Sequence, residues 1–561
     1  MKSLLRSTAI AMAATLSITL TACSSNGSDS AAGGASISVE QAGNYAPTER
    51  DKIKDGGTLT LAISEITPQL NTMQADATLD SRELWETYNP TLILTDGAGK
   101  PSINEDYLTD MKHEVVDGKT KVTYTINEKA TFNDGTPIDW RSFETTRKFQ
   151  SGSVEGAVPD STDGYIDIES VTPGENDKQA VVTYNRVFPF WEEMFGFILH
   201  PSITTAEDFN TFYLDSAKPE LGAGPFKVEK IDRQAGIATF VRNEKWWGDP
   251  AKLEKITYKQ MSNEASINAF KAGEIDATGV STRDRLKIAK DMGDSVDIRA
   301  ASRNSVSYYT LNSKTPLLGD IKVREAIVNA IDRKQLATIR YNGLDYTEEL
   351  PGSFIAKPFQ EYYEDNFSEV AGYDPEKSKK LLDEAGWVEG SDGIREKDGE
   401  KLALRYVTFD SDPVFDAMDV ATQKMLKDVG VDLQIDRRPS SDFSTVMANR
   451  DFDIIGSVVG GGSANGVQNF GQHYLSDSEL NKSGLGSAEF DEKIRELQKL
   501  PTIEEQYKRG NELEKEALAE YGLVPYLNGA SISAMKKGLV NFGPLTFATV
   551  PKEDIGYLKE S

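Results

Sequence analysis

The chain has one cysteine, Cys23, and only three histidines among its 561 residues. A single thiol forms no internal disulfide and leaves no Cys–His pair for covalent catalysis. The histidines His113, His200 and His473 lie far apart and fit no HExxH or similar zinc-binding spacing. A GxSxG nucleophile motif and a GxxxxGK[S/T] phosphate loop are also missing. These absences argue against a bound cofactor and against the common hydrolytic enzymes.

The chain has fewer basic than acidic residues. There are 62 lysines and arginines against 89 aspartates and glutamates, which gives a formal net charge of −27. A surface this acidic repels nucleic acid and anionic lipid head groups, so we expect no nucleic-acid partner. It does not by itself imply a cationic ligand, because a solvated acidic surface favours solubility equally well.

After the amino terminus the sequence has no apolar run that resembles a membrane span. The first residues are different: Lys2 and Arg6 precede an uncharged apolar run, residues 7–20, which is short for a spanning helix. Residues 20–23 read LTAC and resemble a bacterial lipobox. We therefore expect residues 1–22 to be a signal peptide and Cys23 to carry lipid. An ordinary secretory peptide with an incidental cysteine is the alternative.

Residues 23–54 are rich in Ser, Gly, Ala and Asp and contain almost no large apolar side chain. Such a segment buries too little surface to fold, so we expect a flexible tether. The remaining body, about 500 residues, is too long for one core and indicates two or three lobes. Alternating apolar residues at 59, 61 and 63 predict a strand, and residues 402–435 read strand–helix–strand, which is typical of a βαβ crossover.

One segment, residues 309–337, carries the most distinctive pattern: YTLNSKTPLLGDIKVREAIVNAIDRKQLA. It predicts a strand, a loop, and a helix with Asp320 as its N-cap. Its sequence resembles the LNTxxxPFxDxxVRxAxxxAIDR signature of the family 5 bacterial extracellular solute-binding proteins. Further segments resemble that family in the same order: GGTL at 56–59, ATFNDGTP at 130–137, GAGPF at 222–226, RNEKWWG at 242–248, KAGEID at 271–276 and YDPEKSKKLLDEAGW at 373–387.

This resemblance implies a fold and a domain plan. The family fold is an α/β, two-lobed periplasmic-binding-protein type II fold with an extra subdomain on the first lobe. We expect lobe I at residues 55–310 and 525–561, with the subdomain inserted at about 86–215, and lobe II at residues 311–524.

The resemblance also implies a ligand held between the lobes. The loop after the first strand commonly faces the cleft in relatives, which makes Ser64 and Glu65 candidates for ligand contact; a solvated loop is the alternative. Tyr308 and Tyr309 lie on opposite faces of one strand, so one is expected to face the cleft if the other faces the core. An aromatic ring there suits a peptide bond or a sugar ring. Asn312 follows in the same motif.

Peptide-binding members carry a Trp and an Asp in the loop after a Phe-Asp-x strand, and that Asp pairs with the peptide α-ammonium. Here the loop, residues 458–466, reads VVGGGSANG and has neither residue. Its glycines expose backbone polar groups, and two side chains offer neutral hydrogen bonds. The candidates from this loop are Gly460, Gly461, Gly462, Ser463 and Asn465. Either another carboxylate, such as Glu65, holds the amine, or the ligand lacks a free amine, or the loop has no ligand role.

By this resemblance we expect a monomeric, non-enzymatic receptor, anchored outside the cytoplasm by lipid on Cys23. It would pass a peptide to the membrane permease of an ABC importer, whose ATPase subunits supply the energy. An oligosaccharide or another small solute is the alternative ligand. Nickel is disfavoured because histidines are few. A secreted lipoprotein hydrolase is the alternative from another functional class.

Overall fold

The computed structural model of the chain describes residues 38–344, 346–409, 413–439, 442–460 and 463–559. The predictions of a signal peptide at 1–22 and of a lipid on Cys23 concern residues outside these ranges. The predicted tether requires a correction, because the chain is already paired at Val39, where β1 (Val39–Glu40) joins β13 in parallel. Strand pairing of this kind uses backbone groups, which a composition poor in large apolar residues does not rule out.

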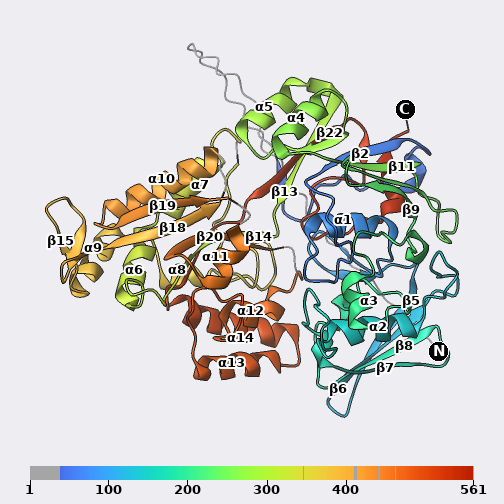
Figure 1. The fold of residues 1–561 in the computed structure, drawn as a ribbon, viewed down its shortest axis with the longest axis horizontal. Helices are drawn as coiled ribbons and strands as arrows, with labels where there is room; N and C mark the ends of the chain where they lie inside the picture. The colour runs from blue at the N-terminus through green and yellow to red at the C-terminus, as the bar shows by residue number, and fades with distance from the viewer. Residues whose placement is uncertain (1–37, 345, 410–412, 440–441, 461–462, 560–561) are drawn as a thin grey trace, which may run out of the picture. The chain divides into compact units, whose positions relative to one another are not determined.

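The first sheet has eight strands and draws on both ends of the described chain (Figure 1). In spatial order they are β1, β13 (Val296–Ser302), β22 (Ala530–Lys536), β12 (Ala277–Gly279), β2 (Thr58–Ile63), β11 (Lys255–Gln260), β10 (Ile237–Arg242) and β9 (Phe226–Asp232). The predicted alternation in β2 is confirmed: Leu59, Leu61 and Ile63 are buried. They share a core with Phe240 and Ile256 of neighbouring strands.

The second sheet has five strands and takes all of them from the middle of the chain. In spatial order they are β19 (Asp432–Arg438), β18 (Ala403–Phe409), β20 (Ile454–Gly460), β14 (Ser305–Leu311) and β21 (Leu523–Leu527). The predicted βαβ crossover is confirmed, since β18 and β19 are parallel and α10 (Pro413–Lys427) connects them. The chain passes between the two sheets twice, at residues 303–304 and again at 528–529.

A third, antiparallel sheet of four strands lies within the segment 86–215. Its order is β5 (Leu108–Val116), β6 (Lys119–Ile126), β8 (Gln179–Tyr184) and β7 (Ile168–Pro173). The short strands are β3 (Ile93–Thr95), β4 (Pro101–Ile103), β15 (Val388–Glu389), β16 (Arg395–Lys397), β17 (Glu400–Lys401), β23 (Leu539–Val540) and β24 (Gly556–Tyr557). The β6 side chains alternate strictly, with Val122, Tyr124 and Ile126 buried, so this sheet has its own apolar face.

Helices cover these sheets. They are α1 (Leu79–Tyr88), α2 (Trp140–Gln150), α3 (Ala206–Thr211), α4 (Asn263–Lys271), α5 (Arg283–Asp291), α6 (Ile321–Ala330), α7 (Arg333–Arg340), α8 (Asn366–Val370), α9 (Pro375–Glu384), α11 (Phe443–Asn449), α12 (Phe470–Tyr474), α13 (Ala488–Gln498) and α14 (Ile503–Leu518). Within the described ranges, no helix is both long enough and apolar enough to cross a bilayer.

The helix ends follow the local signals in the sequence. Asp320 caps α6 by accepting from the Lys322 N–H, as predicted. Asp374 caps α9 by accepting from the Lys377 N–H, and Pro375 stands at the first helical position. Gly386 ends α9 with φ +84°, a conformation that favours glycine.

Candidate functional site

The loop that follows β20 contacts the segment 86–215, which is far away in the sequence. Ser463 donates its hydroxyl to Oε2 of Glu193, and Asn465 donates its side-chain amide to Oε1. Ser463 Oγ also accepts from the Asn465 N–H at 2.8 Å, which fixes the two donors relative to each other. The loop candidates Gly461 and Gly462 lie outside the described residues. Two of the five loop candidates therefore meet at one carboxylate.

Glu193 ends a short 3₁₀ turn, η3 (Trp191–Glu193), which follows a pair of buried phenylalanines. The residue is half-buried, and this burial raises the pKa of its carboxyl, whereas the hydrogen bonds from Ser463 and Asn465 act in the opposite direction. Within the described part of the chain, no basic side chain pairs with this carboxylate. The negative charge is therefore held by neutral donors alone.

The tyrosine pair on β14 divides between the two faces of the second sheet. Tyr309 lies in the core, 1% exposed, with its ring stacked on Tyr526 at 4.5 Å between centroids. Its hydroxyl hydrogen-bonds Thr422 at 3.1 Å. Tyr308 is half-buried on the other face, edge-on to Phe354 at 5.1 Å. Of the two tyrosines, Tyr308 is therefore the one that remains a candidate for ligand contact.

The Phe354 ring also packs against the His473 ring, with 5.7 Å between the ring centroids. We call Tyr308, Phe354 and His473 the aromatic cluster. Beside it, Lys357 is 7% exposed, and burial lowers its pKa to about 8. Burial, together with the charge of Lys357, lowers the pKa of His473 to about 4. Within the described ranges the Lys357 ammonium has no hydrogen-bond acceptor, and the buried carboxylate Glu514 compensates its charge only in part.

Hydrogen bonds connect Lys357 to the loop after β20. The Lys357 N–H donates to Oε1 of Gln360 at 2.9 Å, and Nε2 of Gln360 donates to the carbonyl of Ala464 at 2.8 Å. A buried carboxylate, Glu514, fixes the preceding loop by accepting from the Ser353 hydroxyl at 2.6 Å and the Phe354 N–H at 2.8 Å. The cluster and the Glu193 contact thus share one connected framework.

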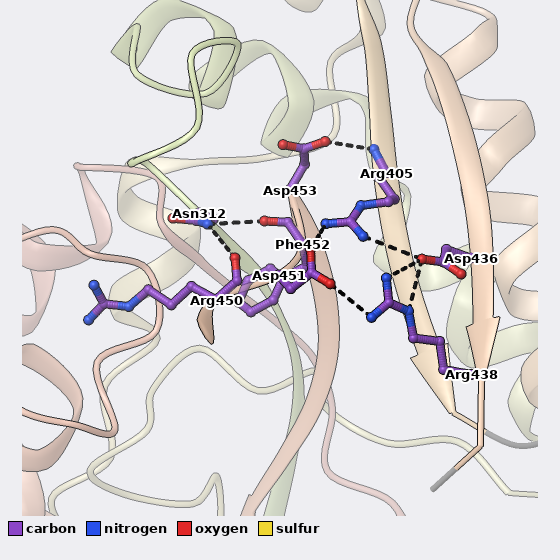
Figure 2. Close-up of polar contacts among 8 residues, drawn as sticks. All are labelled: Asn312, Arg405, Asp436, Arg438, Arg450, Asp451, Phe452 and Asp453. Atoms are coloured by element: carbon purple, nitrogen blue, oxygen red, sulfur yellow. Dashed lines mark hydrogen bonds and ion pairs between the residues drawn. The ribbon is translucent and has the colours of Figure 1, made fainter. Parts of the chain in front are cut away.

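Asn312 serves the backbone in this structure. Its side-chain amide donates to the carbonyls of Arg450 at 3.2 Å and Phe452 at 3.0 Å (Figure 2). It is 3% exposed, and its Oδ1 accepts from the Lys314 N–H at 3.1 Å. Figure 2 also shows the ion pairs of Arg405 and Arg438 with nearby aspartates. These contacts join the ends of β14 and β20, which is a structural role.

The remaining candidates do not join the Glu193 contact. Ser64 and Glu65 are exposed, and the Glu65 N–H donates to Oδ2 of Asp80 at 2.9 Å. Gly460 lies against β14: a β-carbon there would come within 2.5 Å of Cα of Ser305. Glycine at this position therefore allows two strands to approach closely, a packing role.

A cavity of about 1080 Å³ opens among α6, α13 and the end of α14, and it shares His473 with the aromatic cluster. Its lining includes His473, Lys314, Arg324, Glu489, Lys493 and Glu516. None of the eight predicted ligand residues that the structure describes lines it, and the charges in its lining are mixed in sign. The Glu193 contact is the stronger candidate site, because it joins distant parts of the chain at the predicted loop. Within the described ranges, no three His, Cys, Asp or Glu side chains come together to hold a metal ion.

Reasoning from the sequence missed three groups: Glu193, Lys357 and His473. Glu193 is the second residue after the run Phe188–Trp191, whose aromatic residues are typical of a core and predict no ligand-binding carboxylate. Lys357 lies in a stretch, residues 351–359, with no pattern of its own. A lone charged residue in an otherwise apolar run was the only local signal.

A family model, curated relatives and solved structures all relate this chain to solute-binding proteins. A family model, "Bacterial extracellular solute-binding proteins, family 5 Middle", matches residues 101–481. The oligopeptide-binding protein OppA of Mycobacterium bovis is 31% identical over 516 residues, which cover 90% of this chain and 86% of that protein. Among solved structures, a periplasmic EDTA-binding protein, EppA, superposes with a TM-score of 0.83 at 22% identity, covering 92% of this chain and 98% of that one. The oligopeptide-binding protein AppA of Bacillus subtilis, in complex with a nonapeptide, gives 0.74 at 20% identity, covering 91% and 100%.

Proposed function

Because the chain belongs to the family 5 bacterial extracellular solute-binding proteins, we propose that it captures peptides and delivers them to the permease of an ABC importer. It has the two-lobed α/β fold of type II periplasmic binding proteins, with an extra subdomain on the first lobe. The observation that carries the peptide assignment is the 31% identity, across 90% of the chain, to a protein named for oligopeptide binding. Members of this family are substrate-binding receptors, and we propose that this chain likewise leaves its cargo chemically unchanged.

We place the lobe boundaries at the two crossings between the sheets. β14 and β21 both belong to the five-stranded sheet, so lobe II runs from residue 305 to 527. This range begins slightly before, and ends slightly after, the range 311–524 expected from the sequence. The eight-stranded sheet belongs to lobe I, and the segment 86–215 with its four-stranded sheet is the inserted subdomain.

Binding and closure follow from this arrangement. A ligand that touches both lobes stabilises the closed form by the difference between its contacts in the closed and open states. Glu193 lies on the inserted subdomain and Ser463 and Asn465 on lobe II, so their contact joins the two sides directly. Within the aromatic cluster, half-buried Tyr308 offers apolar area that suits peptide side chains.

Native mass spectrometry of the purified protein tests the ligand class. We expect co-purified peptides, released intact after denaturation, and titration calorimetry with synthetic peptides should then show saturable binding. Recovery of an oligosaccharide, with no heat from any peptide, would refute the peptide assignment. Recovery of cleaved peptide after incubation would show that the chain is a hydrolase.

We propose further that the protein is a monomer held outside the cytoplasm by lipid on Cys23. The LTAC sequence at 20–23 and the extracellular family support this localisation. Intact mass spectrometry of the membrane fraction should show a diacylglyceryl-sized addition on wild type. In Cys23→Ala that addition should be lost and the protein should move to the soluble fraction. An unmodified Cys23 on membrane-bound wild type would contradict the anchor.

A further inference from the structure

We propose that Glu193 binds a cationic group of the ligand, with a peptide amine as the chemical class it takes. This inference rests on the proposed peptide-binding function and deepens it. It gives the role of cation partner to a residue of the inserted subdomain, and it assigns the loop residues Ser463 and Asn465 to positioning.

The position of Glu193 is the first reason. Its carboxylate belongs to the inserted subdomain, and both of its oxygens face lobe II, where Ser463 and Asn465 meet them. The residues are separated by 270 and 272 positions in sequence, so their contact exists only where the two parts of the chain meet. A solute that bridges the inserted subdomain and lobe II beside this contact would meet the carboxylate.

The missing counter-charge is the second reason. A carboxylate withdrawn from water is costly unless a cation or several hydrogen bonds compensate it. Here the compensation consists of two neutral donors, which leaves further lone pairs of the carboxylate open to another donor. The nearest charged residue acting on it is Glu192, which has the same sign.

The neighbouring cation is committed elsewhere. Arg186 of the same subdomain forms two hydrogen bonds with Asp167, at 3.1 and 2.7 Å, and donates to the carbonyl of Gln498 at 2.7 Å. With the Val187 carbonyl at 3.3 Å, its guanidinium therefore has four acceptor atoms of its own. A ligand ammonium is the group that completes the site, because it supplies both a positive charge and up to three donors.

Ser463 and Asn465 then act as positioning residues. One donor on each oxygen fixes the plane of the carboxylate in the closed form, so that the ligand ammonium meets it in one orientation. The Glu193 carboxylate held in this way discriminates against anionic ligands, because like charges repel.

The test uses one lysine-free and arginine-free peptide in two forms, with a free amino terminus and with an acetylated one. Binding of each form is measured by calorimetry for wild type, Glu193→Gln and the exposed neighbour control Glu192→Gln. We expect wild type to prefer the free amine by about tenfold or more, the scale of one charge-assisted contact. Glu193→Gln should lose that preference, and Glu192→Gln should keep it.

Peptide pairs with a single added lysine distinguish an α-amine from a side-chain amine as the bound group. Acetylation should then have little effect if the lysine ammonium takes the place at Glu193. Equal binding of free and acetylated lysine-free peptides by wild type would overturn the Glu193 inference while leaving the peptide receptor intact. This comparison needs no variant, so misfolding of Glu193→Gln could not obscure it. No binding of any peptide by wild type would instead reject the proposed function, and with it this inference.

Discussion

The return of the chain from the five-stranded sheet to the eight-stranded sheet is held by one carboxylate, Glu348. Its Oε1 accepts from the Asn528 N–H at 3.0 Å and the Tyr341 hydroxyl at 2.7 Å. Its Oε2 accepts from the Gly529 N–H at 2.7 Å and the Tyr346 hydroxyl at 3.2 Å. Gly529 has φ +93°, so the backbone turns sharply where these bonds hold it. We predict that Glu348→Gln loosens this crossing.

The magnitude follows from the four donors. Glutamine keeps one acceptor oxygen and turns the other into an NH₂ group, so one backbone N–H loses its acceptor in either orientation. A tyrosine hydroxyl can rotate to accept from the new NH₂, but a backbone N–H has no such choice. An unsatisfied buried donor costs about 1–3 kcal/mol, and a hydrogen bond to a charged group contributes about 1.5–3 kcal/mol. We therefore expect the free energy of unfolding to fall by about 2–4 kcal/mol.

Urea denaturation measures the loss in stability, and amide hydrogen exchange locates it. The Asn528 and Gly529 amides should exchange faster in Glu348→Gln, while amides in the middle of β18 stay protected. Glu349→Gln is the matched control, because that side chain is exposed and only its backbone carbonyl contacts Asn528. If Glu348→Gln matches this control within about 0.5 kcal/mol and the two amides keep their protection, the carboxylate does not hold the crossing.

Three further variants test the buried charges of lobe II. Glu514→Gln should lower the unfolding free energy by about 3 kcal/mol, because the fully buried carboxylate accepts four hydrogen bonds; Glu516→Gln on the same helix is the control for urea denaturation. Lys357→Met should raise the free energy of unfolding at pH 7 by up to about 3 kcal/mol, since burial lowers the pKa of this ammonium to about 8. Lys334→Met, the control, should change it little. A lower free energy of unfolding in Lys357→Met would contradict the reasoning. The pKa of His473 is lowered from 6.5 to about 4, so between these pH values the unfolded chain binds more protons than the folded one. The contribution of His473 to stability therefore falls as the pH falls. When the pH falls from 6.5 to 4, the free energy of unfolding of His473→Gln should therefore fall by up to about 3 kcal/mol less than that of wild type. An equal fall in both proteins, measured by urea denaturation at the two pH values, would refute this.

The elements that local signals define could be predicted from the sequence. The helix after Asp374 has its cap, its proline at the first helical position and its closing Gly386 within one short stretch, and the structure confirms all three. The strand at 58–63 follows from alternation alone. Such signals act through neighbours in sequence, so no knowledge of the tertiary fold is needed.

The candidate site was only partly predictable, because its contacts join distant parts of the chain. The loop with Ser463 and Asn465 was identified as unusual, but its partner Glu193 lies 270 residues away from Ser463, and no local pattern links them. Tyr309 was one of two equal alternatives until the packing of Tyr526 against it showed which face is the core. Asn312 is different: its bond to the Lys314 N–H is a turn signal that the sequence contains.

The contacts between the subdomain and lobe II share a feature that bears on how the receptor opens. Asp163 accepts from the side-chain amide of Gln472, Glu193 accepts from a hydroxyl and an amide, and Arg186 donates to a backbone carbonyl. In each case the charge lies on the subdomain and the partner on lobe II is neutral. When such contacts separate, water replaces a neutral partner, which costs less than parting a desolvated ion pair. Under the proposed function, the empty receptor would open at little cost, and a ligand with its own charge would add a contact that exists only in the closed state. Closure then depends on the ligand rather than on the lobes alone, because only a difference in contacts between two states shifts their populations.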